Sequence, residues 1–230
     1  ATVMTSGSGA VLFDIDGTLV DSNYVHVDTW SRAFADAGIT VPSWRIHRCI
    51  GMDGGKLLEE LVGSSDSAAA LEAKELHSSY YAEARKRLQI LPGSRELLQR
   101  IEDLGLTVVL ATSAPEDELA TLRDLLDVEE IVSVVTSSED AEVAKPSPEI
   151  IGVALERAAV GAEDAVMIGD SVWDVEASRR FGVRCIGVRS GGISEAELRE
   201  AGAVAVYDDP AAIIADLEAE VEGHLATDAA

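Results

Sequence analysis

Short apolar runs alternate with segments of helical periodicity along most of the chain. The runs are rich in Val, Ile and Leu, which is typical of strands buried on both faces of a parallel sheet. Between them, apolar residues recur at three- and four-residue intervals, as they do on one face of a helix. The predicted strands cover residues 10–13, 107–110, 131–135, 165–168, 183–188 and 203–206, and the predicted helices cover 95–104, 116–126, 149–159, 172–181, 195–201 and 211–221.

This alternation predicts βαβ units and therefore an α/β fold, a doubly wound, Rossmann-like parallel sheet. One long segment departs from it, because residues 22–91 contain no good strand. Leu91-Pro92-Gly93 is a turn signal that marks the return to the alternating pattern. An insert after the first strand would stand over the carboxyl ends of the strands, where open α/β sheets bind ligands. We therefore expect an inserted α-helical cap domain, with helices near 23–37, 42–49, 56–62 and 67–88.

The domain prediction is completed by the two ends of the chain. Residues 1–9 are small, rich in Ser, Gly and Thr, and aperiodic, so they are expected to form a disordered leader. The core is expected to comprise 10–21 and 92–222, the cap 22–91, and a C-terminal tail 223–230.

Charge excludes several classes of partner. The chain has 42 acidic and 18 basic residues, a net charge of −24, so its field repels nucleic acids and anionic lipid surfaces. No apolar run approaches the roughly 20 residues of a membrane span. The two cysteines, Cys49 and Cys185, lie far apart and favour a reducing, cytoplasmic setting. The acidity, which is densest over residues 195–228, fits solvated helix faces, with an interaction tail as the alternative, and it also suits a salty cytoplasm.

Two carboxylates follow the first predicted strand, in Asp14-Ile15-Asp16-Gly17-Thr18. Residues two apart at a strand end can both project into the crevice once the chain leaves regular pleating. One carboxylate can then attack an electrophile, while the other protonates the leaving group and later deprotonates water. Gly17 permits close approach of the backbone.

The Asp-Xaa-Asp-Gly-Thr sequence resembles the first motif of the haloacid dehalogenase superfamily. Thr112, at the end of the second core strand, resembles the second motif. Lys145, in Ala-Lys-Pro, resembles the third, and Gly169-Asp170 followed by Asp174 resembles the fourth. All four motifs occur in the expected order, each at the end of a predicted strand or in the loop that follows it.

The resemblance implies a role for each motif. Asp14 is the expected nucleophile, Asp16 the acid and base, and Lys145 a positive charge that lets an anion approach a phosphate. Mg²⁺ is the expected cofactor, held by Asp14, Asp170 and the backbone carbonyl of Asp16. Asp174 is expected to orient metal-bound waters or Lys145, or else to be a first-turn acid favoured by the helix dipole. The expected phosphate-binding residues are Gly17, Thr112, Ser113, Ala114 and Lys145.

The helical insert resembles the caps of phosphoglycolate phosphatases and β-phosphoglucomutases. Within it, a loop from Arg45 to Lys56 is expected to reach the substrate through Arg48, Gly51 and Lys56, with solvated helix ends as the alternative for the two cations. His26 stands where mutase-like members carry a histidine near the second Asp, with a helix-surface position as the alternative. Trp30 and Phe34, four residues apart, are expected in the cap core.

Asp16 favours phosphate ester chemistry, because the dehalogenases and phosphonate-cleaving members of the superfamily generally lack this carboxylate. We therefore expect a Mg²⁺-dependent phosphatase acting on a small phosphorylated metabolite such as phosphoglycolate or a sugar phosphate. A β-phosphoglucomutase-like isomerase is the alternative, weakened by Gly54 at the position of the mutase arginine. A noncatalytic binding protein is a third possibility. The oligomeric state, monomer or dimer, stays open.

Overall fold

The computed structural model describes residues 9–143, 149–214 and 216. The expected leader, except Gly9, the expected tail and Lys145 all lie outside these ranges. Two compact units are present: an α/β unit of Ala1–Val20 and Ile90–Ala230, and a helical unit of Asp21–Gln89. The sequence predicts the helical insert over residues 22–91, close to the bounds of this helical unit.

The α/β unit contains a six-stranded parallel sheet in the order β5-β4-β1-β6-β7-β8, which confirms the predicted fold class. From β1 the chain first adds β4 and β5 on one side and then crosses to β6 on the other. The order therefore reverses at β1, and such a switch point opens a crevice at the carboxyl ends of the strands. The strands are β1 (Ala10–Phe13), β4 (Thr107–Leu110), β5 (Val132–Val135), β6 (Ala165–Gly169), β7 (Arg184–Val188) and β8 (Ala205–Tyr207).

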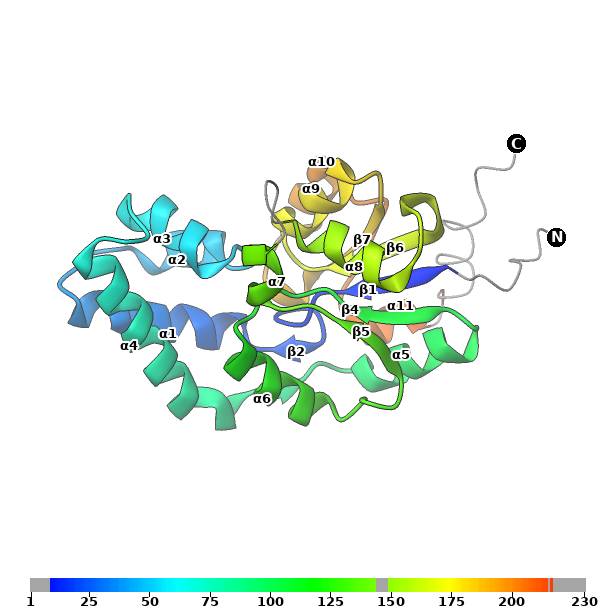
Figure 1. The fold of residues 1–230 in the computed structure, drawn as a ribbon, viewed down its shortest axis with the longest axis horizontal. Helices are drawn as coiled ribbons and strands as arrows, with labels where there is room; N and C mark the ends of the chain where they lie inside the picture. The colour runs from blue at the N-terminus through cyan, green and yellow to red at the C-terminus, as the bar shows by residue number, and fades with distance from the viewer. Residues whose placement is uncertain (1–8, 144–148, 215, 217–230) are drawn as a thin grey trace. The chain divides into compact units, whose positions relative to one another are not determined.

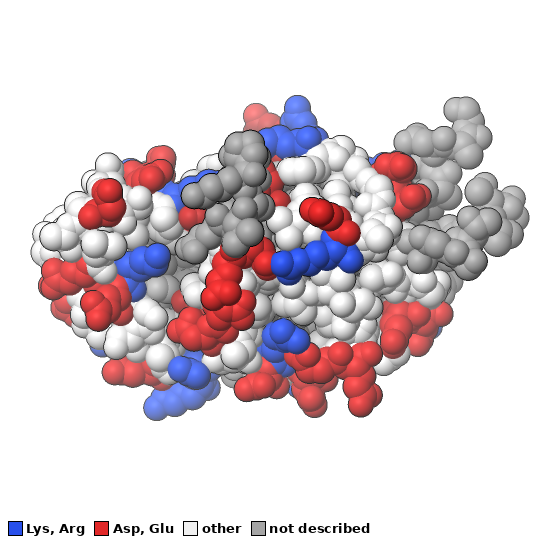
Figure 2. Space-filling model, viewed as in Figure 1, with Lys and Arg blue, Asp and Glu red and all other residues white. Residues whose placement is uncertain are grey.

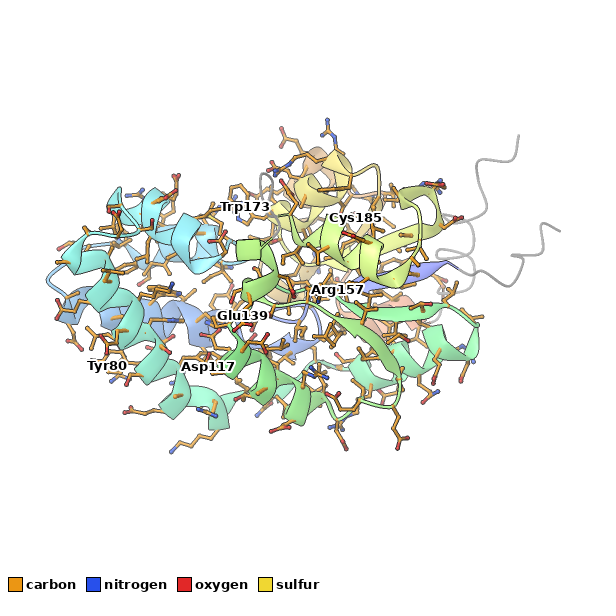
Figure 3. All side chains as sticks on the ribbon, viewed as in Figure 1. Tyr80, Asp117, Glu139, Arg157, Trp173 and Cys185 are labelled. Atoms are coloured by element: carbon orange, nitrogen blue, oxygen red, sulfur yellow. The ribbon has the colours of Figure 1, made fainter. Side chains whose placement is uncertain are left out.

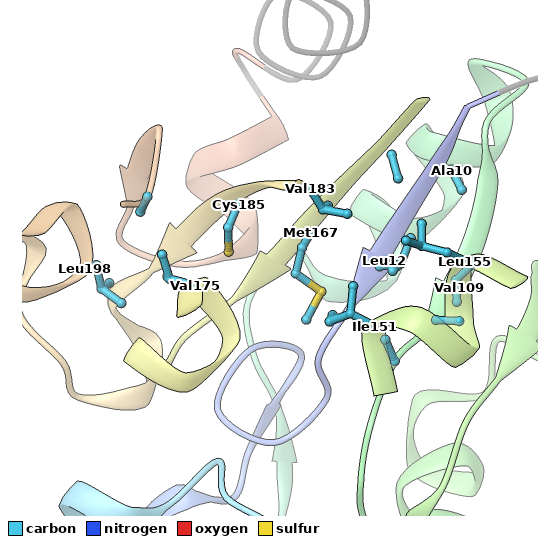
Figure 4. Packing of buried hydrophobic residues seen from close by; sticks show 14 of the residues in the cluster. Ala10, Leu12, Val109, Ile151, Leu155, Met167, Val175, Val183, Cys185 and Leu198 are labelled. Carbon is cyan, nitrogen blue, oxygen red and sulfur yellow. The ribbon is translucent and has the colours of Figure 1, made fainter. Parts of the chain in front are cut away.

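Helices cover both faces of this sheet (Figure 1). On one face, alternate strand residues such as Leu12 and Met167 pack with Ile151 and Val175, all at most 4 % exposed (Figure 4). Each such side chain stabilises the fold by about 1.5–3 kcal/mol on burial. The helices are α5 (Ser94–Asp103), α6 (Glu116–Leu126), α7 (Ser138–Val143), α8 (Ile150–Ala158), α9 (Val172–Arg180), α10 (Glu195–Ala201) and α11 (Pro210–Ile214), with 3-10 turns η2 (Ala162–Asp164) and η3 (Arg189–Gly191).

Helix α7 has no counterpart among the predicted helices, because it is too short to show a helical period. Arg157 of α8 links it to the sheet, donating to the carbonyl of Val135 at 3.2 Å and pairing with Asp140 of α7 (Figure 3). At the end of the chain, the helix predicted over 211–221 is observed as α11 as far as Ile214, and most of its remainder lies outside the described residues.

The helical unit is built from α1 (Asn23–Asp36), α2 (Ser43–Cys49), α3 (Gly54–Val62) and α4 (Ala68–Ala84), followed by the 3-10 turn η1 (Arg85–Arg87). Trp30 and Phe34 are 5 % and 1 % exposed, which confirms that they belong to its core. The chain enters and leaves this unit through β2 (Val20–Asp21) and β3 (Gln89–Ile90), which pair. The expectation of no strand here was wrong, because two residues are too few to show a period.

The loop expected between Arg45 and Lys56 is much shorter in the structure. Helix α2 runs to Cys49 and α3 begins at Gly54, so Arg48 and Lys56 both lie in helices. The carboxylate of Asp53 caps α3 by accepting from the Lys56 amide at 3.0 Å, which fixes where this helix begins. Gly51 lies in the remaining connection with a φ of 102°, a conformation that favours glycine.

Charged residues cover the surface, and acidic side chains outnumber basic ones on the face shown in Figure 2. The ion pairs among them include Arg123–Glu129 at 2.6 Å and Arg199–Glu195 at 2.7 Å. Pairs as exposed as these contribute about 0–1 kcal/mol each. Within the described part of the chain, no helix is both long and apolar enough to cross a membrane.

Candidate metal and catalytic centre

Strand register brings three sequence motifs to one edge of the sheet. Phe13 of β1 pairs with Leu110 of β4 and with Ile168 of β6. The hydrogen-bond ladders of β1 with β6 and with β4 each continue one residue further. The amide of Asp14 donates to the carbonyl of Ile168 at 3.1 Å, and the amide of Ala111 donates to the carbonyl of Phe13 at 2.8 Å. Asp14 and the loops that carry Thr112 and Asp170 therefore leave three adjacent strands at the same edge.

Three of the expected carboxylates converge there. Asp14, Asp170 and Asp174 each present one carboxylate oxygen, and these three oxygens lie within 4.8 Å of one another. Among the described residues, no other three His, Cys, Asp or Glu side chains come together in this way. Burial raises the pKa of Asp14 well above its ordinary value, and repulsion by Asp174, Asp170 and Asp16 raises it further. A divalent cation with oxygen ligands would offset this repulsion, so the donor set fits Mg²⁺.

Asp174 is fixed by the start of α9. Its carboxylate accepts from the amides of Asp170 and Ser171 at 3.1 and 3.2 Å, and the Ser171 hydroxyl in turn accepts from the Asp174 amide at 3.1 Å. This reciprocal arrangement is a capping box. Asp174 therefore caps α9 in its first turn and also joins the carboxylate cluster, and its role toward metal-bound waters or Lys145 stays a prediction. Burial raises its pKa, while the hydrogen bonds from Ser171 lower it in part.

Asp16 lies in a tight loop that the buried Ile15 organises. The carbonyl of Ile15 accepts from the amides of Thr18, Leu19 and Val20 at 2.9–3.1 Å. Gly17 has a φ of 76°, which favours a residue without a side chain. Asp16 is half-buried and forms an isolated bridge with Val20. The loop therefore holds Asp16 close to the strand end that carries Asp14.

Thr112 is 3 % exposed and is held by Thr136 at the end of β5. Its amide donates to the Thr136 hydroxyl at 2.9 Å, and this hydroxyl donates to the Thr112 carbonyl at 2.8 Å. The Ala114 amide donates to the Thr112 hydroxyl at 3.1 Å, within the loop. The phosphate contacts expected of Ser113 and Ala114 stay predictions.

Four residues that support the site were not identified from the sequence: Thr18, Gly169, Ser190 and Gly191. The Thr18 hydroxyl donates to Asp170 at 2.9 Å. A Cβ at Gly169 would lie 2.5 Å from the Asp174 carboxylate, and one at Gly191 would lie 1.8 Å from that of Asp170. Thr18 stands inside the first motif, whereas nothing in the sequence pattern marks Ser190 or Gly191.

Several expected site residues are not part of this geometry. Lys145 lies outside the described residues. His26, Arg48, Gly51 and Lys56 belong to the helical unit, and their substrate-binding roles stay predictions.

Within the helical unit, His26 is buried at 7 % exposed, so the helix-surface alternative for it was wrong. Its ring stacks on Tyr81, with 4.4 Å between centroids. The ammonium of Lys56 pairs with Asp53 at 3.8 Å.

A parallel α/β sheet in which carboxylates, one buried and two half-buried, converge beyond the ends of the central strands is typical of α/β folds with an acidic, metal-type ligand site. The protein-family model described as "Haloacid dehalogenase-like hydrolase" matches residues 11–188. The chain therefore belongs to the haloacid dehalogenase-like hydrolases, which confirms the resemblance of the four motifs.

Named relatives and solved structures are also similar to this chain over most of its length. A phosphorylated carbohydrates phosphatase from Thermotoga maritima is 31 % identical, over 86 % of this chain and 93 % of the relative. A phosphoglycolate phosphatase from Pseudomonas syringae pv. tomato is 28 % identical, over 95 % of this chain and 80 % of the relative. A crystal structure of a hydrolase from Pseudomonas syringae superimposes with a TM-score of 0.85 at 32 % identity, covering 92 % of this chain and 99 % of the other.

Proposed function

We propose that this chain is a Mg²⁺-dependent phosphatase that hydrolyses small phosphomonoesters through an aspartyl phosphate on Asp14. The observation that carries the proposal is the cluster of Asp14, Asp170 and Asp174 at the carboxyl edge of β1 and β6. The names of the phosphatase relatives support the same activity.

In the first half-reaction, a carboxylate oxygen of Asp14 forms a bond to phosphorus while the ester P–O bond breaks. Asp16 gives its proton to the departing alcohol oxygen. In the second, Asp16 takes a proton from water, the water oxygen attacks phosphorus, and the Asp14–phosphate bond breaks. The products are inorganic phosphate and the free enzyme, with both aspartates restored.

The surrounding groups have separate tasks. When bound, Mg²⁺ supplies positive charge for the phosphoryl oxygens, and Asp14, Asp170, Asp174 and the Asp16 carbonyl are the residues that would hold it. The Thr112 hydroxyl and Lys145 are assigned to the same phosphoryl oxygens, since an anionic nucleophile needs such charge compensation.

The helical unit is proposed as the cap that selects the substrate, with His26, Arg48, Gly51 and Lys56 as contacts. The substrate is then a small phosphorylated metabolite such as phosphoglycolate or a sugar phosphate, and no nucleic acid or membrane takes part. A cytoplasmic location is part of the proposal and is supported by two free, buried cysteines.

The test measures phosphate release from phosphoglycolate, glucose phosphates, nucleoside monophosphates and an aryl phosphate, with Mg²⁺ or with EDTA. Release that needs Mg²⁺ and disappears in Asp14→Asn is the expected result. Isomerised sugar phosphate, formed only with a bisphosphate activator, would instead identify a mutase. Ligand binding without turnover of any substrate would identify a binding protein.

A further inference from the structure

The turn after β7 makes a hydrogen bond to the loop that carries the two aspartates of the first motif. The Ser190 hydroxyl donates to the carbonyl of Gly17 at 2.7 Å, across 173 positions of sequence. Gly17 is buried, so its carbonyl needs a partner within the protein. This bond therefore fixes the peptide that joins Gly17 to Thr18, directly after the residue that follows Asp16.

The same turn limits the space around the carboxylate of Asp170. A Cβ at Gly191 would lie 1.8 Å from Asp170 Oδ2. On its other oxygen, Asp170 accepts from the Thr18 hydroxyl at 2.9 Å. Asp170 thus lies between the turn that carries Ser190 and the loop that Ser190 holds.

The turn itself is anchored at its outer end. The guanidinium of Arg189 contacts Asp208, which follows β8, at 2.7 and 2.9 Å. Within the turn, the Gly192 amide donates to the Arg189 carbonyl at 2.9 Å. Ser190 therefore projects its hydroxyl from a defined position.

We propose that Ser190 is a positioning residue for the metal-binding carboxylates, acting through the Gly17 carbonyl and Thr18 on Asp14, Asp16 and Asp170. Without the Ser190 hydroxyl, the Gly17 carbonyl loses a hydrogen-bond donor. The loop that carries Asp14, Asp16 and Thr18 then relaxes, and Thr18 no longer holds Asp170 in one orientation. The proposal deepens the proposed function and rests on it, since the carboxylates are taken as the metal site of the phosphatase.

The experiment titrates Mn²⁺ into the full chain and follows free Mn²⁺ by electron paramagnetic resonance, without substrate. Wild type is compared with Ser190→Ala, Ser190→Thr and Ser194→Ala. Ser194 is a matched control, because it lies four residues along and its hydroxyl accepts from the Glu197 amide at 3.2 Å, capping α10 outside the site. Should Ser190→Ala unfold, Ser190→Cys, with its weaker donor, replaces it.

Ser190→Ala is expected to weaken Mn²⁺ binding about tenfold, as loss of a partner behind metal ligands does, while Ser190→Thr and Ser194→Ala bind as wild type does. In the steady-state assay, Ser190→Ala should raise the Mg²⁺ concentration for half-activation by a similar factor and leave the substrate KM unchanged. Equal Mn²⁺ affinity in Ser190→Ala and wild type would overturn the proposal, as would wild type that binds no Mn²⁺. Wild type that binds Mn²⁺ but releases no phosphate would overturn the proposed function alone, because the Mn²⁺ comparison still tests Ser190.

Discussion

Buried polar side chains are arranged differently in the two units of this chain. In the α/β unit, Asp170 is 2 % exposed and lies with Asp14 and Asp174 beyond the ends of parallel strands. In the helical unit, all of whose residues are described, the buried polar residues carry hydroxyl, amide and imidazole groups and no carboxylate, with His26 and His77 stacked among aromatic rings.

The difference separates two physical tasks. Crowded carboxylates repel one another and leave a site that binding of a cation stabilises. Stacked rings contribute apolar burial and hold helices together without requiring a ligand. We therefore expect the chemistry at the sheet edge, and changes confined to one unit should leave the characteristic property of the other intact.

The largest effect is expected for Asp14→Asn, which keeps the side chain's shape and removes the nucleophile. Phosphate release should fall by more than about 10⁴-fold, measured under Mg²⁺ saturation. Asp117→Asn is the matched control, because Asp117 is an exposed acid in the first turn of α6 (Figure 3), and it should retain wild-type turnover. A near-normal rate in Asp14→Asn would exclude the aspartyl-phosphate route.

Phe34→Ala examines the other unit. Phe34 is 1 % exposed and stacks on Trp30 with 5.4 Å between ring centroids, so its loss should cost about 3–5 kcal/mol of the stability of the helical unit. Amide hydrogen exchange of α1 and α4 should accelerate, while Mn²⁺ affinity at the sheet edge stays constant. Leu71→Ala, at a side chain 53 % exposed on α4, is the control. A large change in Mn²⁺ affinity in Phe34→Ala would show that the units are not independent.

The same substitution, threonine to valine, can be made at a buried position in each unit. Thr18→Val removes the hydroxyl that donates to Asp170 and should weaken Mn²⁺ binding about 10–100-fold. Thr29→Val removes an equally buried hydroxyl that donates to the Val25 carbonyl at 3.0 Å in α1, and it should leave Mn²⁺ binding unchanged. Equal effects of the two variants in a Mn²⁺ titration would contradict a special role for Thr18.

The helical unit should also respond to acid. Burial, and to a smaller extent His26, hold the pKa of His77 well below its ordinary value near 6.5. The unfolded chain then binds a proton that the folded chain does not, so this contribution to stability is complete above about pH 6.5 and is lost as the pH falls below it.

The slope that His77 contributes should reach at most about 1.4 kcal/mol per pH unit. Urea unfolding of wild type and His77→Phe between pH 5 and about 7.5 measures it, since phenylalanine keeps an aromatic ring against Trp30 and does not titrate. The stability of wild type relative to His77→Phe should fall as the pH is lowered below about 6.5. Parallel stability curves would refute the assignment to His77.

The sequence predicts the sheet and most of the helices around it, because the strands carry mainly apolar runs and the helices, except the short α7, carry a helical period. The resemblance of the motifs also implies that Asp14 and Asp170 meet, and the structure brings them together beyond the ends of the paired strands β1 and β6. The role of Ser190 cannot be predicted in this way, because its partner Gly17 lies 173 positions away and a serine after a strand carries no signal of its own. Similarly, the start of α3 at Gly54 depends on the Asp53 cap, which local periodicity does not show.

The central claim is that Asp14 becomes covalently phosphorylated at the sheet edge. The most direct test quenches the enzyme during turnover with borohydride, which reduces an aspartyl phosphate to homoserine, and locates the product by peptide mass spectrometry. Homoserine at position 14, dependent on both Mg²⁺ and substrate, is the predicted result. Phosphate release accompanied by homoserine at another aspartate, with Asp14 unmodified, would contradict the account.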